Sequence, residues 1–286
     1  HIYRLLRSGE VRVNKKRVKA ETRLALDDIV RVPPIRVPQK RDLVPRAAPI
    51  SDDTLPILFE DEHLLIVDKP AGLACHGGSG IAFGLIERLR ASRPNQPFLE
   101  LAHRLDRDTS GAIIVCKSRK ALVRLQKSMR EGGIEKHYRT LVKGDWVNDR
   151  QHVKLPLFKY VTKEGERRVR VDPEKGVPSH SIFTLIRRYG DVSFLDVELL
   201  TGRTHQIRVH AAESGHPLVG DDKYGDFDFN REVSKGLLGI PFRRMFLHSY
   251  SLAFEHPVTH EKMKIESPLP EACEELIRVL NERKTV

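Results

Sequence analysis

A carboxylate stands among arginines in the stretch HRLDRDTSG, residues 103–111. Asp106 lies between Arg104 and Arg107, and the apolar runs FLEL and AIIVC flank the stretch on its two sides. A buried carboxylic acid tends to keep its proton, because burial disfavours the charged form. A guanidinium beside it offers a planar fork to both carboxylate oxygens and favours ionisation. We therefore predict an ionised Asp106 on a loop between two buried strands.

Three other stretches combine reactive side chains with a loop or a strand end. They are DKPAGLACHGGSG (68–80), EKHYRTLVKG (135–144) and TGRTHQIRVH (201–210). Each also has a purely structural interpretation. Lys69 and Pro70 can simply end a strand, and Tyr138 can be a core aromatic residue with its hydroxyl at the rim.

Several kinds of site are not indicated. His205 and His210 are five residues apart, a poor spacing for one helical face, and no cysteine or third histidine lies at a ligand interval, so no metal site is predicted. The glycines of HGGSG lack the Lys-Ser/Thr pair of a phosphate-binding loop. HRLD differs in spacing from the H-R-D loop of protein kinases, and the downstream Asn is absent.

The elements that would carry these residues are short strands with occasional helices. ILFEDEHLLIVDKPAG predicts two strands joined by a turn, and KHYRTLVKGDW and FLHSYSLAFEHP each predict one strand. HSIFTLIRRYGDVSFLDVELL predicts a hairpin that turns at Gly190-Asp191. Helices are predicted for SRKALVRLQKSMREGG with Ser118 as N-cap, for THQIRVHAAESG ending at Gly215, and for EACEELIRVLNERK. Strands outnumber helices, so we expect an α+β fold with a mixed, largely antiparallel sheet.

The positive charge is concentrated at the start of the chain. The formal net charge is +11, and residues 1–50 hold 13 Lys and Arg against 5 Asp and Glu. Such a segment is either a solvated basic surface or a module that binds a polyanion. In residues 1–34 a helix end closes on Gly9, VRVN and RVKA form a hairpin around a basic turn, and LALDDIVRV leads into a last strand. This pattern resembles the second half of an S4 RNA-binding domain.

The S4 resemblance implies contact with structured RNA through shape and phosphates. The basic residues expected to make it are Arg12, Lys15, Lys16, Arg17 and Lys19. Residues 35–53 contain prolines and mixed charge without any period, which predicts a mobile linker. We expect three parts: a partial S4-like domain (1–34), the linker (35–53) and a catalytic domain (54–286).

Taken together, HRLDRDTSG, KHYRTLVKG and TGRTHQIRVH resemble the RluA family of RNA pseudouridine synthases over about residues 55–268. The stretch HGGSGIAFGLIERLRASRP and the S4-like start are most similar to the C branch that acts on large-subunit (23S) ribosomal RNA. The resemblance implies a pseudouridine synthase fold with a central active-site cleft. It also implies that the N1–C1′ bond of uridine breaks, the uracil rotates, and C5 joins C1′. Atoms are conserved, so no redox cofactor, metal or external donor is implied.

The resemblance also assigns roles to residues. Asp106 would attack the nucleotide or stabilise developing charge, with attack at C1′, attack at C6 and elimination at C2′ all open. Arg203 would pair with this carboxylate. Tyr138 would stack on the displaced uracil and help remove the C5 proton, although a phenol with pKa about 10 is a poor base unless its surroundings lower that value. Arg104 would fill the space that the flipped base leaves.

Other assignments stay open at this point. Arg107 would meet a phosphate, or pair locally with Asp108. A non-catalytic RNA-binding assembly factor would explain the basic charge alone. A glycosidic-bond hydrolase would need two carboxylates, with Asp108 as the available partner of Asp106.

The compartment is inferred from composition. Cys75, Cys116 and Cys273 are far apart and form no CxxC pair, which indicates a reducing environment. No tract of about 18 apolar residues is present, so a membrane span is not predicted. The chain begins at His1 without a visible signal peptide. We expect a cytoplasmic monomer whose partner is 23S ribosomal RNA.

Overall fold

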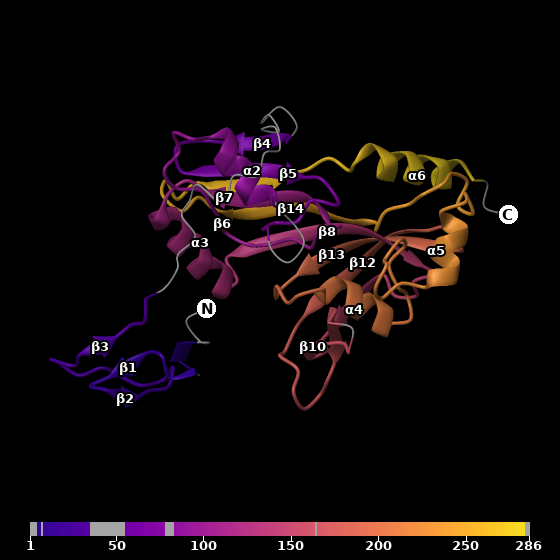
Figure 1. Ribbon diagram of the computed structural model, residues 1–286. Coiled ribbons are helices and arrows are strands. Elements are labelled where there is room, and N and C mark those ends of the chain that lie inside the picture. Colours follow the sequence, from indigo (N-terminus) through magenta and orange to yellow (C-terminus); the bar gives the residue numbers. More distant parts are fainter. Residues whose placement is uncertain (1–4, 7, 35–54, 78–82, 164, 284–286) are drawn as a thin grey trace. The chain divides into compact units, whose positions relative to one another are not determined.

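The computed structural model describes residues 5–6, 8–34, 55–77, 83–163 and 165–283. The chain divides into two compact units, residues 1–48 and 49–286, each of which is described by itself (Figure 1). The predicted linker and the Gly78-Ser79-Gly80 part of the HGGSG stretch lie outside the described residues. None of the helices in the described part of the chain has the length and apolar character needed to cross a bilayer.

The first unit contains a small antiparallel sheet in the order β2-β1-β3. Its strands are β1 (Arg12–Val13), β2 (Lys16–Arg17) and β3 (Val30–Arg31). Asn14 and Lys15 have φ angles of 48° and 67°, which is the conformation that a two-residue hairpin turn requires. Gly9 has a φ of 75° and follows a helical turn, so the predicted C-cap and hairpin are confirmed.

The second unit is built on one ten-stranded sheet. Its strands are β4 (Ile57–Glu60), β5 (Leu64–Lys69), β6 (Glu100–Leu101), β7 (Ser110–Cys116), β8 (Ile134–Lys143), β9 (Arg150–Val153), β12 (Ser181–Arg188), β13 (Val192–Leu199), β14 (Leu247–Glu255) and β15 (Lys262–Glu266). The main path runs β4-β5-β7-β14-β8-β13-β12-β9, with β15 on β14 and β6 on β7. Only the β7–β14 pairing is parallel among these strands. The predicted mixed, largely antiparallel sheet is therefore confirmed.

Five helices surround the sheet in the described residues: α2 (Leu85–Ser92), α3 (Arg119–Arg130), α4 (Gln206–Glu213), α5 (Phe227–Val233) and α6 (Glu271–Glu282). Ser118 caps α3, since its hydroxyl accepts from the Ala121 N–H at 3.2 Å, as predicted. A separate antiparallel hairpin, β10 (Leu157–Val161) and β11 (Arg167–Val171), projects from the large sheet near α4 (Figure 1).

The centre of the sheet is apolar on both faces. All seven residues of β7 are buried, and β5 is buried at every position except Asp68. Central strands covered on both faces read as continuous apolar runs, which is how AIIVC and LLIV appear in the sequence. These strands give the loops at their ends a rigid base.

Candidate active site

Asp106 lies on the loop between β6 and β7, as predicted. The Thr109 N–H donates to the Asp106 carbonyl at 3.2 Å and closes a turn, after which the chain enters β7. At Gly111 (φ 110°) the backbone passes so close to β14 that an added Cβ would lie 2.3 Å from the Ser249 carbonyl oxygen. Only glycine fits there. The loop is therefore held at a fixed place beside β14.

Lys69, at the end of β5, holds this loop in place through hydrogen bonds to backbone carbonyl groups. Its ammonium is fully buried and donates to the carbonyl oxygens of Pro70 at 3.0 Å, Leu73 at 2.7 Å and Arg107 at 3.0 Å. Burial lowers the pKa of Lys69 to about 8. The sequence alone predicts no more than a strand end at Lys69. The available signal was a lysine that closes an otherwise apolar strand, since buried lysines need dedicated partners.

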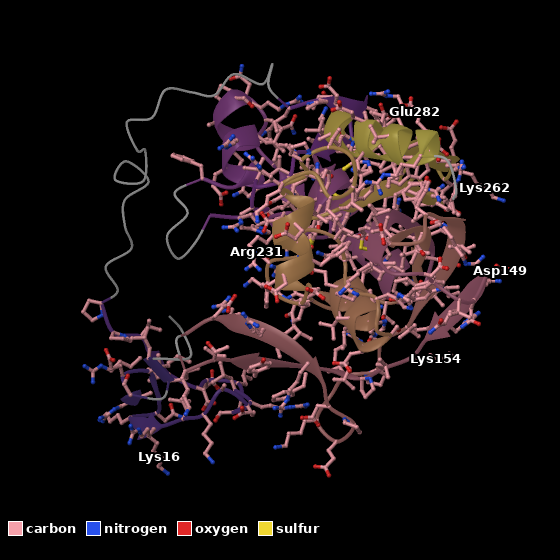
Figure 2. All side chains as sticks on the ribbon, turned by 90° about the vertical axis from the view of Figure 1, so that its right-hand side faces the viewer. Lys16, Asp149, Lys154, Arg231, Lys262 and Glu282 are labelled. Atoms are coloured by element: carbon pink, nitrogen blue, oxygen red, sulfur yellow. The ribbon has the colours of Figure 1, made fainter. Side chains whose placement is uncertain are left out.

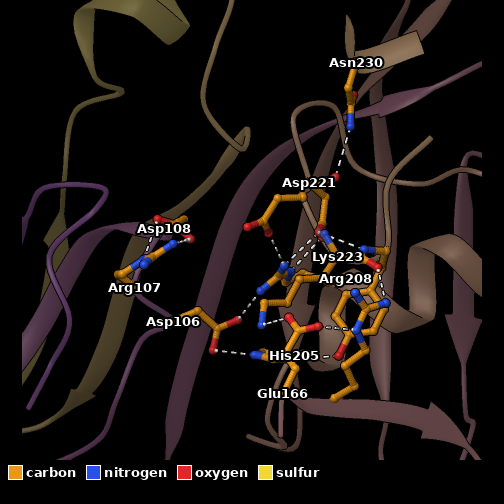
Figure 3. A network of polar contacts seen from close by, with 12 residues as sticks. Asp106, Arg107, Asp108, Glu166, His205, Arg208, Asp221, Lys223 and Asn230 are labelled. Carbon is orange, nitrogen blue, oxygen red and sulfur yellow. Dashed lines mark hydrogen bonds and ion pairs between the residues drawn. The ribbon is translucent and has the colours of Figure 1, made fainter. Parts of the chain in front are cut away.

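The guanidinium that faces Asp106 belongs to Arg208, in α4. Its Nη1 lies 3.4 Å from Asp106 Oδ2, while Nε and Nη2 each donate to an oxygen of Asp221 at 2.7 Å (Figure 3). The Arg208 and Asp221 side chains are 3% and 1% exposed. Burial favours the neutral forms of both groups, but their bidentate pairing outweighs it, so the pKa of Arg208 is raised and that of Asp221 is lowered.

The prediction that Arg203 pairs with Asp106 is wrong. Arg203 is exposed at the edge of the site, and its Nε donates to the Pro178 carbonyl at 3.4 Å. The reason is local: the chain adopts a left-handed conformation at His205, with φ of 54°, before α4 begins. This turn leaves the first arginine of TGRTHQIR outside and carries the second, Arg208, toward Asp106.

Tyr138 comes from β8 and is 6% exposed. Burial raises the pKa of its phenol, and a hydrogen bond with the Ser249 side chain offsets this only in part. The cleft therefore favours the neutral phenol, which disfavours the phenolate that a proton-abstracting role would need. The ring remains suited to stacking.

Asp106 and Tyr138 line one cleft with about 520 Å³ of empty space, open solvent at its mouth included. The cleft is lined by Arg104, Leu105, Asp106, Thr109, Tyr138, Leu199, Gly202, Arg203, Thr204, His205, Gln206, Ile207 and Leu247. Asp106, Tyr138, Arg203 and Arg104 are thus brought together as expected. The exposed Arg104 can reach a bound molecule, and Leu105 is buried in the core.

Arg107 does not line this cleft. Its Nε and Nη2 lie 3.2 and 3.3 Å from the carboxylate of Asp108, so the local ion pair is formed. Asp108 is likewise absent from the cleft lining. It is therefore not placed as the second carboxylate that a glycosidase mechanism requires.

The N-terminal basic residues form a separate surface. Arg12, Lys15, Lys16, Arg17 and Lys19 are all exposed on or beside the β1–β2 hairpin. Figure 2 shows the Lys16 side chain directed away from its strands. The hairpin is braced by Asn14, whose side chain donates to Asp28 at 2.6 Å and accepts from the Ile29 N–H at 2.9 Å.

The cleft presents the Asp106 carboxylate and the Tyr138 ring to an open space, and the buried Arg208 is paired with that carboxylate. Among the described residues, no three His, Cys, Asp or Glu side chains are grouped as a metal ion would need. The arrangement can hold a planar ring against Tyr138 with Asp106 beside it. It suits attack on, or charge stabilisation of, a ring-bearing substrate.

Comparison with known proteins identifies the family. The family model for RNA pseudouridylate synthase matches residues 63–213. Ribosomal large subunit pseudouridine synthase C of Pasteurella multocida is 48% identical over 286 residues, covering 99% of this chain and 86% of the relative. Its counterpart in Escherichia coli (strain K12) is 47% identical over 281 residues, covering 98% and 87%.

The fold comparison agrees. The solved structure of human RNA Pseudouridylate Synthase Domain Containing 1 matches with a TM-score of 0.61 and 26% identity, covering 80% of this chain and 95% of that one. The family match spans Asp106, Tyr138 and Arg208. This chain therefore belongs to the RNA pseudouridylate synthase family.

Proposed function

We propose that this protein converts specific uridines of large-subunit (23S) ribosomal RNA to pseudouridine. The observation that carries the proposal is an Asp106 carboxylate that lines an open cleft together with Tyr138 and is paired with the buried Arg208. The names of the relatives that match nearly the whole chain support ribosomal RNA of the large subunit as the substrate.

The reaction needs a uridine outside its stack, because folded RNA otherwise hides the glycosidic bond. The exposed guanidinium of Arg104, at the cleft, would occupy the space that the flipped base leaves. The ring of Tyr138 would stack on the uracil and hold it while it turns. Arg203, at the edge of the cleft, would contact the RNA backbone instead of Asp106.

Asp106 would act as an ionised carboxylate. It attacks the nucleotide at C1′ or C6, or removes a proton at C2′, and in each case the N1–C1′ bond breaks. The uracil then rotates and the C5–C1′ bond forms. The Asp106–C1′ bond breaks as it does so in the first route, Asp106 leaves C6 in the second, and Asp106 returns the proton to C2′ in the third. In every route C5 loses its proton and N1 gains one. Arg208 would hold the carboxylate in place through Oδ2, while Asp221 fixes the guanidinium.

We also propose that residues 1–34 form a partial S4-like domain that binds RNA and that residues 35–53 connect it to a catalytic domain of residues 54–286. The protein would be a cytoplasmic monomer. The exposed basic hairpin supports the first point, since phosphate contacts dominate RNA affinity. Three buried, free cysteines suit a reducing compartment.

The test is release of tritium from C5-labelled uridine in a 23S ribosomal RNA transcript. We expect release by the wild type and, for Asp106→Asn, a fall of at least about a thousandfold with unchanged RNA affinity. Asp108→Asn is the matched control, since it removes a neighbouring carboxylate outside the cleft. Release of free uracil would indicate a hydrolase, and binding without release would indicate an assembly factor. Tritium release by Asp106→Asn at the wild-type rate would remove Asp106 from the mechanism.

A further inference from the structure

The two oxygens of the Asp106 carboxylate face different groups. Oδ2 lies 3.4 Å from Arg208 Nη1, and Oδ1 lies 3.9 Å from Nε2 of His205 (Figure 3). His205 is the residue before α4, and its side chain is 13% exposed at the wall of the cleft. The imidazole therefore faces the carboxylate oxygen that Arg208 does not hold.

Hydrogen bonds on the far side of the imidazole determine which nitrogen carries its proton. The Tyr224 hydroxyl oxygen accepts from the Val169 N–H at 2.8 Å, and it lies 2.7 Å from His205 Nδ1. A backbone amide can only donate, so of these two neighbours only His205 Nδ1 can accept the single phenolic proton. Nδ1 then accepts, and the ring hydrogen is on Nε2, toward Asp106.

The surroundings favour the neutral ring. Burial lowers the pKa of His205, the Asp106 and Asp221 carboxylates raise it, and the Arg208 and Lys223 cations lower it, with a net downward shift. An imidazolium would also need Nδ1 to donate to Tyr224, and the phenolic proton would then lose this acceptor. The hydrogen bonds and the surroundings of the ring therefore both favour a neutral His205 with its hydrogen on Nε2.

We infer that His205 is a positioning residue for Asp106: a neutral imidazole whose Nε2–H is directed at Oδ1 because Tyr224 and the β10–β11 hairpin fix its tautomer. This inference rests on the proposed function. A neutral donor orients the carboxylate without adding a second positive charge that would pair with it. The 3.9 Å separation exceeds a hydrogen bond, as catalytic contacts often do before substrate binds, and we expect it to shorten when substrate fills the cleft.

The hairpin is tied to this arrangement by further contacts. Glu166 accepts from Lys223 at 2.5 Å and from Arg168 at 2.8 Å, and Arg168 Nη1 donates to the Lys223 carbonyl at 3.3 Å. The Tyr224 ring lies edge-on to His205, with centroids 5.5 Å apart. A chain of contacts thus runs from the exposed hairpin through Tyr224 and His205 to Asp106.

Tyr224→Phe tests the inference, because it keeps the ring and removes only the hydroxyl. We expect the single-turnover rate to fall about tenfold while RNA affinity stays unchanged. An acid limb should also appear in the pH profile, since Nδ1 becomes free to take a proton. Tyr189→Phe is the matched control: it removes a hydroxyl that donates to Asn281 at 2.8 Å, outside the cleft, and should behave as wild type. Equal rates and pH profiles for the two variants would overturn the inference.

Substitution of His205 gives a second test, in which one variant is expected to recover activity that the other loses. His205→Asn tolerates the left-handed backbone but removes the Nε2–H donor, whereas His205→Gln places an amide N–H near the same point. We expect His205→Gln to recover part of the rate that His205→Asn loses, at equal RNA affinity. Equal loss in both variants, or loss that follows RNA affinity or the melting temperature, would assign His205 a structural role and overturn the inference.

Nitrogen NMR of the RNA-free protein keeps this test independent of activity. We expect the His205 ring to show a protonated Nε2 and an unprotonated Nδ1 in the wild type, and a mixture of tautomers in Tyr224→Phe. A protonated Nδ1 in the wild type would refute the fixed tautomer even if pseudouridine forms. Absence of pseudouridine with the expected tautomer present would refute the proposed function instead.

Discussion

The active site and the N-terminal hairpin both contain positively charged side chains, but these are buried and paired in the site and exposed in the hairpin. In the cleft, Arg208 is 3% exposed and paired with Asp221, which is 1% exposed. In the hairpin, Lys15 and Lys16 are exposed, and it is the backbone that is constrained, with positive φ at Asn14 and Lys15. Arg208 is thus fixed by a side-chain partner, whereas the hairpin lysines are fixed only at their backbone.

Breaking the buried pair should have the largest effect. Arg208→Met leaves the Asp221 carboxylate buried without its partner, which we expect to cost about 3–5 kcal/mol of unfolding free energy. Activity should be abolished as well. Urea denaturation measures the first effect. Arg231→Met is the control, since its ion pair with Asp228 is exposed and should contribute less than about 1 kcal/mol. Equal stability of the two variants would contradict the contrast between buried and exposed charge.

Lys69 gives the next largest effect and a dependence on pH. Its pKa falls from 10.5 to about 8 on folding, so between these values the unfolded chain binds a proton that the folded chain has released. Stability of the wild type should therefore rise with pH from about 8 to 10.5, by on the order of 3 kcal/mol at most. Lys69→Met should abolish this rise and remove the hydrogen bonds to three carbonyl oxygens.

The measurement is the unfolding free energy of both proteins at several pH values from 8 to 10.5. Lys262→Met, on the exposed end of β15, serves as the control and should follow the wild type. A Lys69→Met curve parallel to that of the wild type would show that Lys69 stays charged when buried.

The smallest effect is expected at the hairpin, and it should appear in binding alone. Lys15→Ala with Lys16→Ala should reduce the salt dependence of RNA affinity by about 0.7–0.9 in log–log slope for each RNA phosphate that these lysines neutralise. The rate at saturating RNA should not change. Lys262→Ala with Lys264→Ala is the control, since it removes the same charge from β15. If the hairpin variant lowers the saturated rate, the separation between binding and chemistry is wrong.

Local structure was predictable because its causes are local. The cap at Ser118, the turn at Gly190 and the C-cap at Gly9 depend on a few neighbouring residues, and all three are confirmed. Asp106 and Tyr138 were found because their motifs are complete in the sequence, and both line the cleft.

What failed depended on the three-dimensional path of the chain, which the order of residue types does not specify. TGRTHQIR contains two arginines, and only the left-handed turn at His205 decides that Arg208, and not Arg203, faces Asp106. The role of Lys69 needs carbonyl groups from residues 70, 73 and 107 in one place. The spacing of residues along the chain does not specify which carbonyl groups surround the Lys69 ammonium.

The order of strands has a consequence for how the protein is made. Asp106 belongs to the half of the sheet that contains β5 and β7, and Tyr138 to the half that contains β8 and β13. The strand between β7 and β8 is β14, which begins at Leu247, more than a hundred residues after either. During translation the two halves of the cleft therefore cannot be joined through the sheet until β14 has been synthesised. The nascent chain contains Asp106, Tyr138 and Arg208 before it contains the strand that brings them together.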